Sequence, residues 1–409
     1  MIYDLIVIGA GASGLFVASM VNQNQKVLII EKNDRPGKKL KITGKGRCNI
    51  TNSKPINEFF EEVFTNNKFL FSSFYEFTNY DLLDFLNQKG LNTKTERGGR
   101  VFPFTDKSTD VIDSLFCNSK AEFLFNENVL NVSKDNIFTV ETDKGKYNSR
   151  FLLIATGGLS YPMTGSTGDG YKFAKSFGHT IIPTRPALVG LNVDLNDEKE
   201  LMGLSLRNVN VSLISNKKHI SEFGELLFTH YGISGPTILT LSSFAEKGDI
   251  VSIDLKPGLD YTKLDNRLLR DFNDSINKSF KNSLDKLFPK SMINYIVNRS
   301  GIDEDKKVNQ ITLDERKSLI NLIKNLEFKV ISRRGFNEAV ITDGGINVKE
   351  INPKTMESNL IPGLYFAGEI IDVAANTGGY NLQIAFSTAY KAFKSISEEL
   401  WRLLEELSL

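Results

Sequence analysis

The chain has 409 residues, of which 41% are hydrophobic and 24% are charged. This composition is typical of a folded chain with two domains, or with one large domain that carries an insertion, and it excludes disordered and collagen-like proteins. Fifty basic and 49 acidic residues give a net charge of +1, so no global electric field attracts nucleic acid or membrane.

The rare residue types and the apolar runs exclude further classes of protein. Two cysteines and three histidines are too few for a disulfide framework or a zinc cluster, and we expect no metal site. No basic segment precedes the first apolar run, and no run reaches the roughly 18 apolar residues of a membrane-spanning helix. The sequence therefore predicts a cytoplasmic protein without a signal peptide or a membrane partner.

The N-terminal segment predicts a nucleotide-binding crossover. Residues 5–8 form a continuous apolar run, typical of a strand buried on both faces of a parallel sheet, and residues 26–30 form a second one. A glycine turn and an apolar helix lie between these two runs. The residues of the turn are Gly9, Ala10, Gly11, Ala12, Ser13 and Gly14. Such a turn leaves room for a pyrophosphate beside the free amides of a helix N-terminus.

Glu31 ends the second apolar run, 20 residues after Gly11. An acid at this spacing accepts hydrogen bonds from ribose hydroxyls and repels a 2′-phosphate, so the pattern predicts FAD or NAD rather than NADP. The alternative is a glycine turn that binds no ligand. Another glycine-rich segment, residues 165–170, has no strand before it, and we therefore expect no second nucleotide-binding domain.

A basic run follows this crossover. It contains Arg35, Lys38, Lys39, Lys41, Lys45 and Arg47, with no acidic residue among them. The run either neutralises phosphates or an anionic substrate, or it is a solvated loop. The sequence leaves both interpretations open.

Eight short motifs then occur in a fixed order along nearly the whole chain. They are TGKGRCNITN (residues 43–52), GRVFP (99–103), ATGGLSYP (155–162), TGSTGDG (164–170), LFTHYGISGP (227–236), EINPKTMES (350–358), GLYFAGE (363–369) and TGGYNLQ (377–383). In these motifs the chain resembles a family of bacterial FAD-binding oxidoreductases known by the aminoacetone-oxidase or BaiN-like (YhiN-like) name. One departure is the stretch DVAAN at residues 372–376, where the family commonly has more acidic residues.

The resemblance implies an α/β fold, with a discontinuous glutathione-reductase-like FAD-binding Rossmann domain, an inserted β-barrel domain and a helical subdomain. The middle of the chain agrees, because short strand-like runs flank a helical stretch. The runs are residues 189–193, 209–214, 250–255, 328–331 and 338–341, and the helical stretch is residues 259–325, in which Pro289 begins a helix and Gly301 ends one. An antiparallel barrel and a sandwich both fit these runs. The predicted boundaries are residues 1–185 and 344–409 for the FAD-binding domain, 186–258 and 327–343 for the inserted domain, and 259–326 for the helical subdomain.

The fingerprint and the resemblance together imply the cofactor-binding residues. They are Gly9, Ala10, Gly11, Ala12, Ser13, Gly14, Glu31, Lys32, Lys39, Thr43, Gly44, Arg47, Cys48, Asn49, Val129, Ala155, Thr156, Gly157, Gly368, Glu369, Gly378, Gly379, Tyr380, Asn381 and Leu382. A C-terminal helix from about Tyr380 to about Leu404 would point its first amides at the flavin. With one fingerprint and no CxxxxC pair, NADH or NADPH is expected to bind only transiently, as an electron donor.

Cys48, His230 and Tyr231 are the candidate catalytic residues. Cys48 lies beside Arg47, which can lower the pKa of its thiol; it is either a proton donor or nucleophile, or a small packing residue. His230 and Tyr231 either donate protons to the substrate or pack at the domain junction. The remaining residues of these types are expected in the core (Cys117) and at the surface or a strand edge (His179 and His219).

The sequence therefore predicts an FAD-dependent oxidoreductase that transfers hydride between the flavin and an unidentified substrate. Three alternatives stay open: reduction of a uridine to dihydrouridine in ribosomal RNA, amine oxidation that forms peroxide, and a non-catalytic flavin-bound binding factor. The partner is a small molecule or ribosomal RNA. Residues 256–335 carry 17 basic and 11 acidic residues, which fits either an RNA contact or ordinary solvated helices. The oligomeric state does not follow from the sequence.

Overall fold

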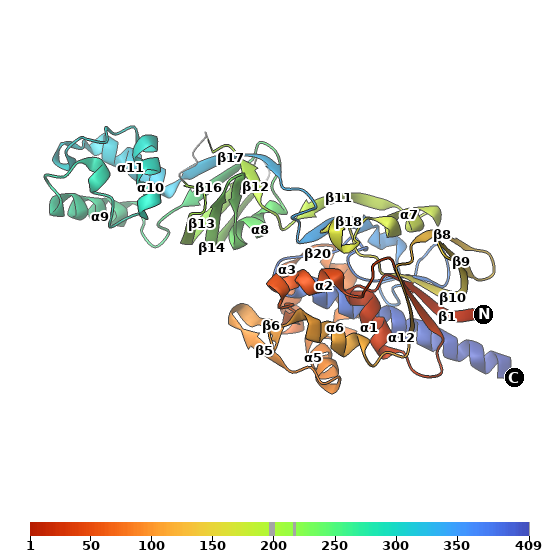
Figure 1. The fold of residues 1–409 in the computed structure, drawn as a ribbon. Helices are drawn as coiled ribbons and strands as arrows, with labels where there is room; N and C mark the ends of the chain where they lie inside the picture. The colour runs from red at the N-terminus through yellow and green to blue at the C-terminus, as the bar shows by residue number, and fades with distance from the viewer. Residues whose placement is uncertain (196–200, 216–217, 409) are drawn as a thin grey trace. The chain divides into compact units, whose positions relative to one another are not determined.

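The computed structural model describes residues 1–195, 201–215 and 218–408 (Figure 1). The chain divides into two compact units. The first unit consists of Met1–Pro186 and Ala339–Leu409, and the second unit is Ala187–Glu338. Because the chain leaves the first unit after Pro186 and returns at Ala339, the first unit is built from two separate stretches of sequence.

A seven-stranded sheet forms the centre of the first unit, in the order β7-β2-β1-β10-β9-β8, with β19 beside β10. Its strands are β1 (Ile2–Ile8), β2 (Val27–Glu31), β7 (Glu122–Phe125), β8 (Val129–Lys134), β9 (Phe138–Thr142), β10 (Lys146–Ile154) and β19 (Leu364–Phe366). Parallel pairing joins β7, β2, β1, β10 and β19. Leu5, Ile6 and Val7 of β1 are fully buried, as their continuous apolar run predicts.

The helices described in the first unit are α1 (Ala12–Met20), α2 (Lys38–Ile42), α3 (Phe59–Glu62), α4 (Phe71–Glu76), α5 (Asn79–Gln88), α6 (Ser108–Phe116), α7 (Asp169–Ser176) and α12 (Tyr380–Ser408). Helix α1 packs along α12 (Figure 1). The Phe16 ring of α1 contacts the rings of Phe77, Phe85 and Phe386 at centroid distances of 5.0–5.3 Å. Since α12 comes from the C-terminal stretch, this aromatic contact holds the two stretches of the first unit together.

Three small sheets complete the first unit. The first contains β3 (Thr51–Asn52), β5 (Thr93–Glu96) and β6 (Arg100–Pro103), the second pairs β4 (Val63–Thr65) with β20 (Ala374–Ala375), and the third pairs β11 (Ile181–Ala187) with β18 (Ile341–Ile346). Strand β11 leads into the second unit and β18 begins soon after the chain returns. The two connections therefore start from neighbouring strands.

The second unit contains a closed antiparallel barrel in the order β12-β15-β14-β13-β16-β17. Its strands are β12 (Leu191–Val193), β13 (Ser205–Ile214), β14 (His219–Thr229), β15 (Gly232–Ser234), β16 (Ile250–Asp254) and β17 (Leu326–Arg333), and its helices are α8 (Pro236–Ser242), α9 (Tyr261–Asp274), α10 (Lys290–Ser300) and α11 (Leu313–Lys324). Helix α10 begins after Pro289 and ends at Gly301, as predicted. Closure leaves the sheet without exposed edges, which settles the choice between barrel and sandwich.

Three sequence-based expectations are wrong. Residues 338–340 are not a strand, because a turn closed by the hydrogen bond from Glu338 N to Gly335 O ends there, and β18 starts only at Ile341. Cys117 is exposed, since the buried face of α6 ends before it and Cys117 is the C-cap residue. His179 is buried with 3% of its surface exposed, because its ring packs edge-on against Phe366 and its Nε2 is hydrogen-bonded to Ser358 Oγ at 2.8 Å.

Candidate functional site

The turn between β1 and α1 has the close backbone contacts that its glycines allow. A Cβ atom on Gly14 would lie 1.9 Å from Gly9 O, and one on Gly9 would lie 2.7 Å from Ala155 O. A Cβ on Gly11 would meet no protein atom within 4 Å, so space is open at this position. The first turn of a helix leaves its amides without intrahelical acceptors. Open space beside free amides fits a pyrophosphate.

Ser13, which was predicted in this cofactor site, turns its side chain away from it. Its hydroxyl donates a hydrogen bond to Ala385 O of α12, at 3.0 Å. A Cβ on Gly368 would come within 2.4 Å of the same hydroxyl oxygen. Ser13 therefore joins α1 to α12 and offers only its backbone amide to a ligand.

Glu31 lies at the end of β2 with 8% of its surface exposed. Its Oε2 accepts a hydrogen bond from Ala10 N at 2.8 Å, and its Oε1 accepts two from Asn33, from N at 2.8 Å and from Nδ2 at 2.6 Å. A carboxylate has about four acceptor positions. One position therefore stays free, on Oε2, and it fits a single ribose hydroxyl.

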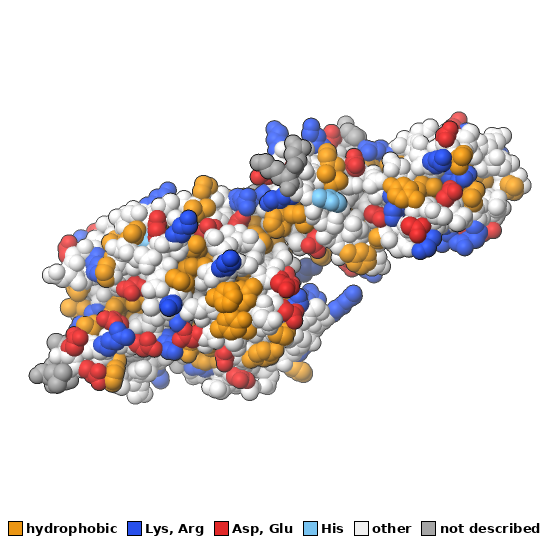
Figure 2. Space-filling model, turned by 180° about the vertical axis from the view of Figure 1, so that it is seen from behind, with side chains coloured by type: hydrophobic (Ala, Val, Ile, Leu, Met, Phe, Trp, Pro, Cys, Tyr) orange, Lys and Arg blue, Asp and Glu red, His pale blue; other side chains and the backbone are white. Residues whose placement is uncertain are grey.

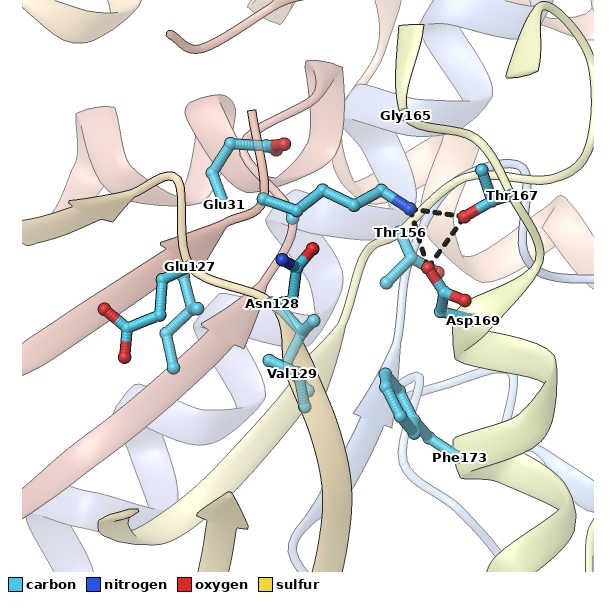
Figure 3. Close-up of a pocket in the computed structure, with 13 residues that line it drawn as sticks. Glu31, Glu127, Asn128, Val129, Thr156, Gly165, Thr167, Asp169 and Phe173 are labelled. Atoms are coloured by element: carbon cyan, nitrogen blue, oxygen red, sulfur yellow. Dashed lines mark hydrogen bonds and ion pairs between the residues drawn. The ribbon is translucent and has the colours of Figure 1, made fainter. Parts of the chain in front are cut away.

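A depression lies beside Glu31, and we call it the nucleotide pocket (Figure 3). It contains about 460 Å³ of space between protein atoms, part of which is open solvent. Its lining residues are Ile8, Gly9, Ile30, Glu31, Lys32, Glu127, Asn128, Val129, Thr156, Gly165, Thr167, Asp169 and Phe173. Five of them, Gly9, Glu31, Lys32, Val129 and Thr156, were predicted from the sequence. The others were missed, although the glycine-rich residues 165–170 were a signal that was set aside because no strand precedes them.

A second cluster surrounds Glu369, which follows β19 and the turn at Gly368. The ammonium group of Lys39 lies 2.5 Å from Glu369 Oε2 and also contacts the Ser160 hydroxyl. Glu369 Oε1 accepts hydrogen bonds from Ser160 Oγ at 2.6 Å and from Thr342 N at 2.7 Å. These contacts hold Lys39 and Glu369, both predicted site residues, side by side. Because Glu369 already balances the charge of Lys39, a phosphate beside this pair would gain little from the lysine charge.

Most of the basic run that contains Lys39 is paired in the same way. Arg35 and Lys38 both pair with Asp34, and Arg47 pairs with Glu96 and Asp106. Lys41 and Lys45 are exposed. Acidic residues outside the run neutralise most of its charge. The run is therefore neither an unpaired cationic site for an anion nor a fully solvated loop.

The start of α12 is held in place by the polar residues of β3. A Cβ on Gly379 would lie 2.3 Å from Thr51 O, and Asn52 Nδ2 donates a hydrogen bond to Gly378 O at 3.1 Å. The side chain of Asn381 is bonded to β20 through Ala375, donating to its O at 2.7 Å and accepting from its N at 3.0 Å. Asn381 can therefore offer a cofactor only its backbone amide.

Tyr380 is the first residue of α12, and its side chain is engaged by other residues of the protein and cannot contact a ligand. Its ring packs edge-on against Phe59 at a centroid distance of 4.9 Å, and its hydroxyl donates a hydrogen bond to Glu62 at 3.3 Å. Burial raises the pKa of this phenol to about 12. The amides of the first turn, with the positive end of the helix dipole, are what α12 presents to a bound group.

Cys48 is buried with none of its surface exposed, in a backbone conformation with φ 60°. Burial raises the pKa of its thiol to about 12. The prediction that Arg47 lowers this pKa is wrong, because Arg47 is directed at Asp106, 2.7 Å away, and its guanidinium lies 4.0 Å from the centre of the Phe102 ring. The neighbouring Asn49 Oδ1 is a buried acceptor to which no hydrogen bond is described.

His230 and Tyr231 belong to the second unit, in the turn between β14 and β15. The two rings are in edge contact at 5.0 Å, and the guanidinium of Arg334 lies 4.2 Å from the centre of the Tyr231 ring. Arg334 is held in turn by Glu338. His230 is exposed, so its imidazole is open to solvent, whereas Tyr231 is half-buried.

The basic excess of the second unit is also partly neutralised. Its ion pairs include Arg267 with Asp271, Lys286 with Asp274, Lys306 with Glu315 and Arg316 with Asp265. On the face shown in Figure 2, basic and acidic side chains are interspersed over both units. Among the described residues, no group of His, Cys, Asp and Glu could hold a metal ion, and no helix has the length and apolarity to cross a bilayer.

The fold and the site together define a class. A discontinuous α/β unit with a glycine turn, an acid at the end of the second strand and a C-terminal helix, interrupted by a barrel unit, is the architecture of a flavin-dependent oxidoreductase. The family model described as "HI0933-like protein Rossmann domain" matches residues 3–395, and the chain belongs to this family. FAD is the cofactor that this family of Rossmann proteins implies, and the residues described above fit it.

Two curated relatives carry different substrate names. The chain is 34% identical to the "Ribosomal RNA dihydrouridine synthase" of Escherichia coli (strain K12), over 95% of this chain and 96% of that one. It is 29% identical to the "3-dehydro-bile acid delta(4,6)-reductase" of Clostridium scindens, over 96% of this chain and 98% of that one. The family resemblance inferred from the motifs is thereby confirmed.

Solved structures share the fold. The 3-ketosteroid-delta4-(5alpha)-dehydrogenase of Rhodococcus jostii RHA1 has a TM-score of 0.51 at 12% identity and covers 97% of this chain and 96% of its own. An open conformation of a flavocytochrome c3 fumarate reductase has a TM-score of 0.50 at 15% identity, with 97% and 78% covered. At these identities the likeness concerns the fold alone, and it confirms the predicted fold class.

Proposed function

We propose that this chain reduces a uridine of ribosomal RNA to dihydrouridine, with NADH or NADPH as the electron donor. The observation that carries this proposal is the similarity to two chains with that name. The one from Haemophilus influenzae is 32% identical over 96% of this chain, in addition to the one from Escherichia coli. This alternative from the sequence has better support than an unidentified small molecule.

The names of the relatives have a common chemistry. Uracil contains a C5=C6 double bond conjugated to the C4 carbonyl, and a 3-dehydro-bile acid with double bonds at positions 4 and 6 contains a similar conjugated system. Reduction of such a bond adds hydride to the carbon β to the carbonyl, which is C6 in uracil, and a proton to the α carbon, which is C5. Neither name describes an amine oxidase, and we do not propose amine oxidation.

FAD, when bound and reduced by NADH or NADPH, would supply the hydride. The residues that would hold it are the backbone amides of Gly11–Gly14 for the pyrophosphate, Glu31 for one ribose hydroxyl, and the first amides of α12 for the flavin. The positive end of the α12 dipole favours negative charge beside these amides. Lys39 and Glu369 form a fixed ion pair in the same unit, which can orient polar groups of the cofactor without adding net charge.

The protein must also supply the proton for C5. Burial raises the pKa of the Cys48 thiol to about 12, so it stays protonated well above neutral pH, but none of its surface is exposed and a substrate cannot touch it without a rearrangement. His230 is exposed, so a substrate can reach its imidazole, a side chain that commonly serves as a general acid. We therefore propose His230 as the proton donor, with Tyr231, whose ring is in edge contact with it at 5.0 Å, as the group that orients its ring.

Nucleoside mass spectrometry of ribosomal RNA tests the proposal. A strain that lacks this chain should lose one dihydrouridine, and the intact gene should restore it. His230→Asn, which keeps a polar side chain but removes the imidazole, should keep its FAD but restore little dihydrouridine. Cys48→Ala should restore it fully. An unchanged nucleoside profile in the deletion strain overturns the RNA assignment, and turnover of a 3-oxo-4,6-diene steroid by the purified protein would then support the second candidate.

A further inference from the structure

A lysine side chain connects two sides of the nucleotide pocket. Glu31 and Asp169 lie on opposite sides of this pocket in Figure 3, and Lys32 directly follows Glu31. The Lys32 ammonium group lies 2.6 Å from Asp169 Oδ2 and also contacts the Thr167 hydroxyl. Thr167 Oγ1 donates a further hydrogen bond to Asp169 Oδ2 at 2.7 Å. The end of β2 is therefore joined to the first residue of α7.

A second contact fastens the same two segments. Asn33 Nδ2 donates a hydrogen bond to Thr164 O at 3.0 Å. A Cβ on Gly165 would lie 2.5 Å from Asn33 Nδ2 and 3.4 Å from Lys32 Cε. Residues 164–169 thus lie directly against Lys32 and Asn33, and they cannot move outward without breaking these contacts.

From this geometry we propose that Lys32 and Asp169 form a latch across the nucleotide pocket, which must open each time FAD enters or leaves. Three other lining residues are fixed in the folded core. Ile8 and Ile30 lie in the central sheet and Phe173 is a buried residue of α7, with 5%, 1% and 5% of their surfaces exposed. The side chains of Lys32 and Asp169 are 27% and 34% exposed. An ion pair this exposed adds little stability, so it can open and close.

A latch differs from a direct cofactor contact in its kinetic signature. The latch contact joins two protein groups, so it has to break for passage in either direction, and removing it speeds entry and exit alike. A direct contact to the cofactor holds the bound state only, and removing it speeds exit and weakens affinity. The proposal rests on the FAD cofactor and is independent of the RNA substrate.

Stopped-flow mixing of apoprotein with FAD measures the entry rate, and trapping of released FAD by a second apoflavoprotein measures the exit rate. In Lys32→Met both rates should rise about threefold to fivefold, while Kd stays within about twofold. Asp169→Asn should act in the same way, and the double variant should show no further rise, because the two residues act as a pair.

Lys172→Met is the matched control. Lys172 also pairs with Asp169, 3.5 Å from its Oδ1, but its side chain is 78% exposed and it does not line the pocket. Its rates should equal those of the wild type. Unchanged rates in Lys32→Met overturn the proposal, and so does a faster exit with an unchanged entry rate, which would make Lys32 a cofactor ligand. Thermal unfolding of each apoprotein shows that the variants are folded.

Discussion

The two units bury their polar groups differently. Among the described residues, the first unit buries the carboxylates of Glu31, Glu127, Asp343 and Asp372, with 8%, 3%, 2% and 7% of their surfaces exposed. The second unit buries one, Asp271, at 6%, and Arg267 on the next helical turn pairs with it. Burying a charge is costly unless partners compensate it. Asp343 and Asp372 are compensated by Arg185 and Asn66, whereas Glu31 lines the nucleotide pocket and keeps one acceptor position for a ligand.

Each unit contains glycines with and without close backbone neighbours, and one from each unit makes a clean pair for comparison. A Cβ on Gly14 in the first unit would lie 1.9 Å from Gly9 O, whereas Gly258 in the second unit has no neighbour where a Cβ would be and no left-handed φ. A close backbone approach cannot relax as a flexible side chain can. Substitution at Gly14 should therefore be tolerated far less than substitution at Gly258.

The largest expected effect is at Gly14. Gly14→Val should destabilise the first unit by about 3 kcal/mol or more, because the added atoms overlap Gly9 O. Gly258→Val in the second unit should change stability by less than about 0.5 kcal/mol, since nothing lies near its Cβ position. Urea unfolding of both variants measures the difference. Similar losses of unfolding free energy in the two variants would contradict the difference in packing between Gly14 and Gly258.

The two cysteines provide the next largest effect. Cys117 is exposed, while Cys48 is fully buried with a pKa raised to about 12 by burial. Alkylation by iodoacetamide at pH 8 should modify Cys117 at least about 100-fold faster, because only an accessible thiolate reacts. Peptide mass spectrometry after timed quenching measures both rates. Comparable rates in the native protein would show that the region around Cys48 opens readily.

A smaller effect is expected from His179 in the first unit. Burial lowers the pKa of its imidazole, despite the neighbouring Glu350. The unfolded chain therefore takes up a proton more readily below pH 6.5, the ordinary value, and the stability from neutral His179 is lost as the pH falls through that range. We expect a loss of the order of 1 kcal/mol.

Urea unfolding at pH 8 and pH 5.5 measures this loss, and His179→Gln is the control. Glutamine cannot take up the proton, so the variant should show a smaller difference between the two pH values. An equal pH dependence in the wild type and the variant would contradict the role of His179.

The parts of the fold that follow local rules could be predicted from the sequence. The glycine turn, the buried strands and the helix between Pro289 and Gly301 each depend on neighbours close in the chain. Closure of the barrel could not be predicted, because an alternating apolar pattern describes the face of a strand and not its partner. Cys117 was misplaced for a related reason, since the apolar period of α6 does not mark its last turn.

Site residues could be predicted where a recognised motif contains them, and the other site residues could not. Gly11 and Glu31 have a fixed spacing, whereas Asp169 lines the same pocket through the motif at residues 164–170, which was set aside because no strand precedes it. His179 was expected at the surface because its partner Ser358 lies 179 residues away. The pairing of the basic run was hidden for the same reason, as Glu369 is 330 residues from Lys39. Contacts over such separations follow from the folded chain and not from composition.

Flavin binding by Gly11→Ala tests the central claim most directly. At Gly11 an added Cβ meets no protein atom and the backbone is not left-handed, so the variant should fold like the wild type. The methyl group would instead occupy the space assigned to the pyrophosphate. We predict that wild-type protein binds one FAD and is yellow, while Gly11→Ala has the same unfolding midpoint as wild-type apoprotein and binds FAD at least about tenfold more weakly. Equal affinity in the variant, or wild-type protein that stays colourless with excess FAD, would contradict the account.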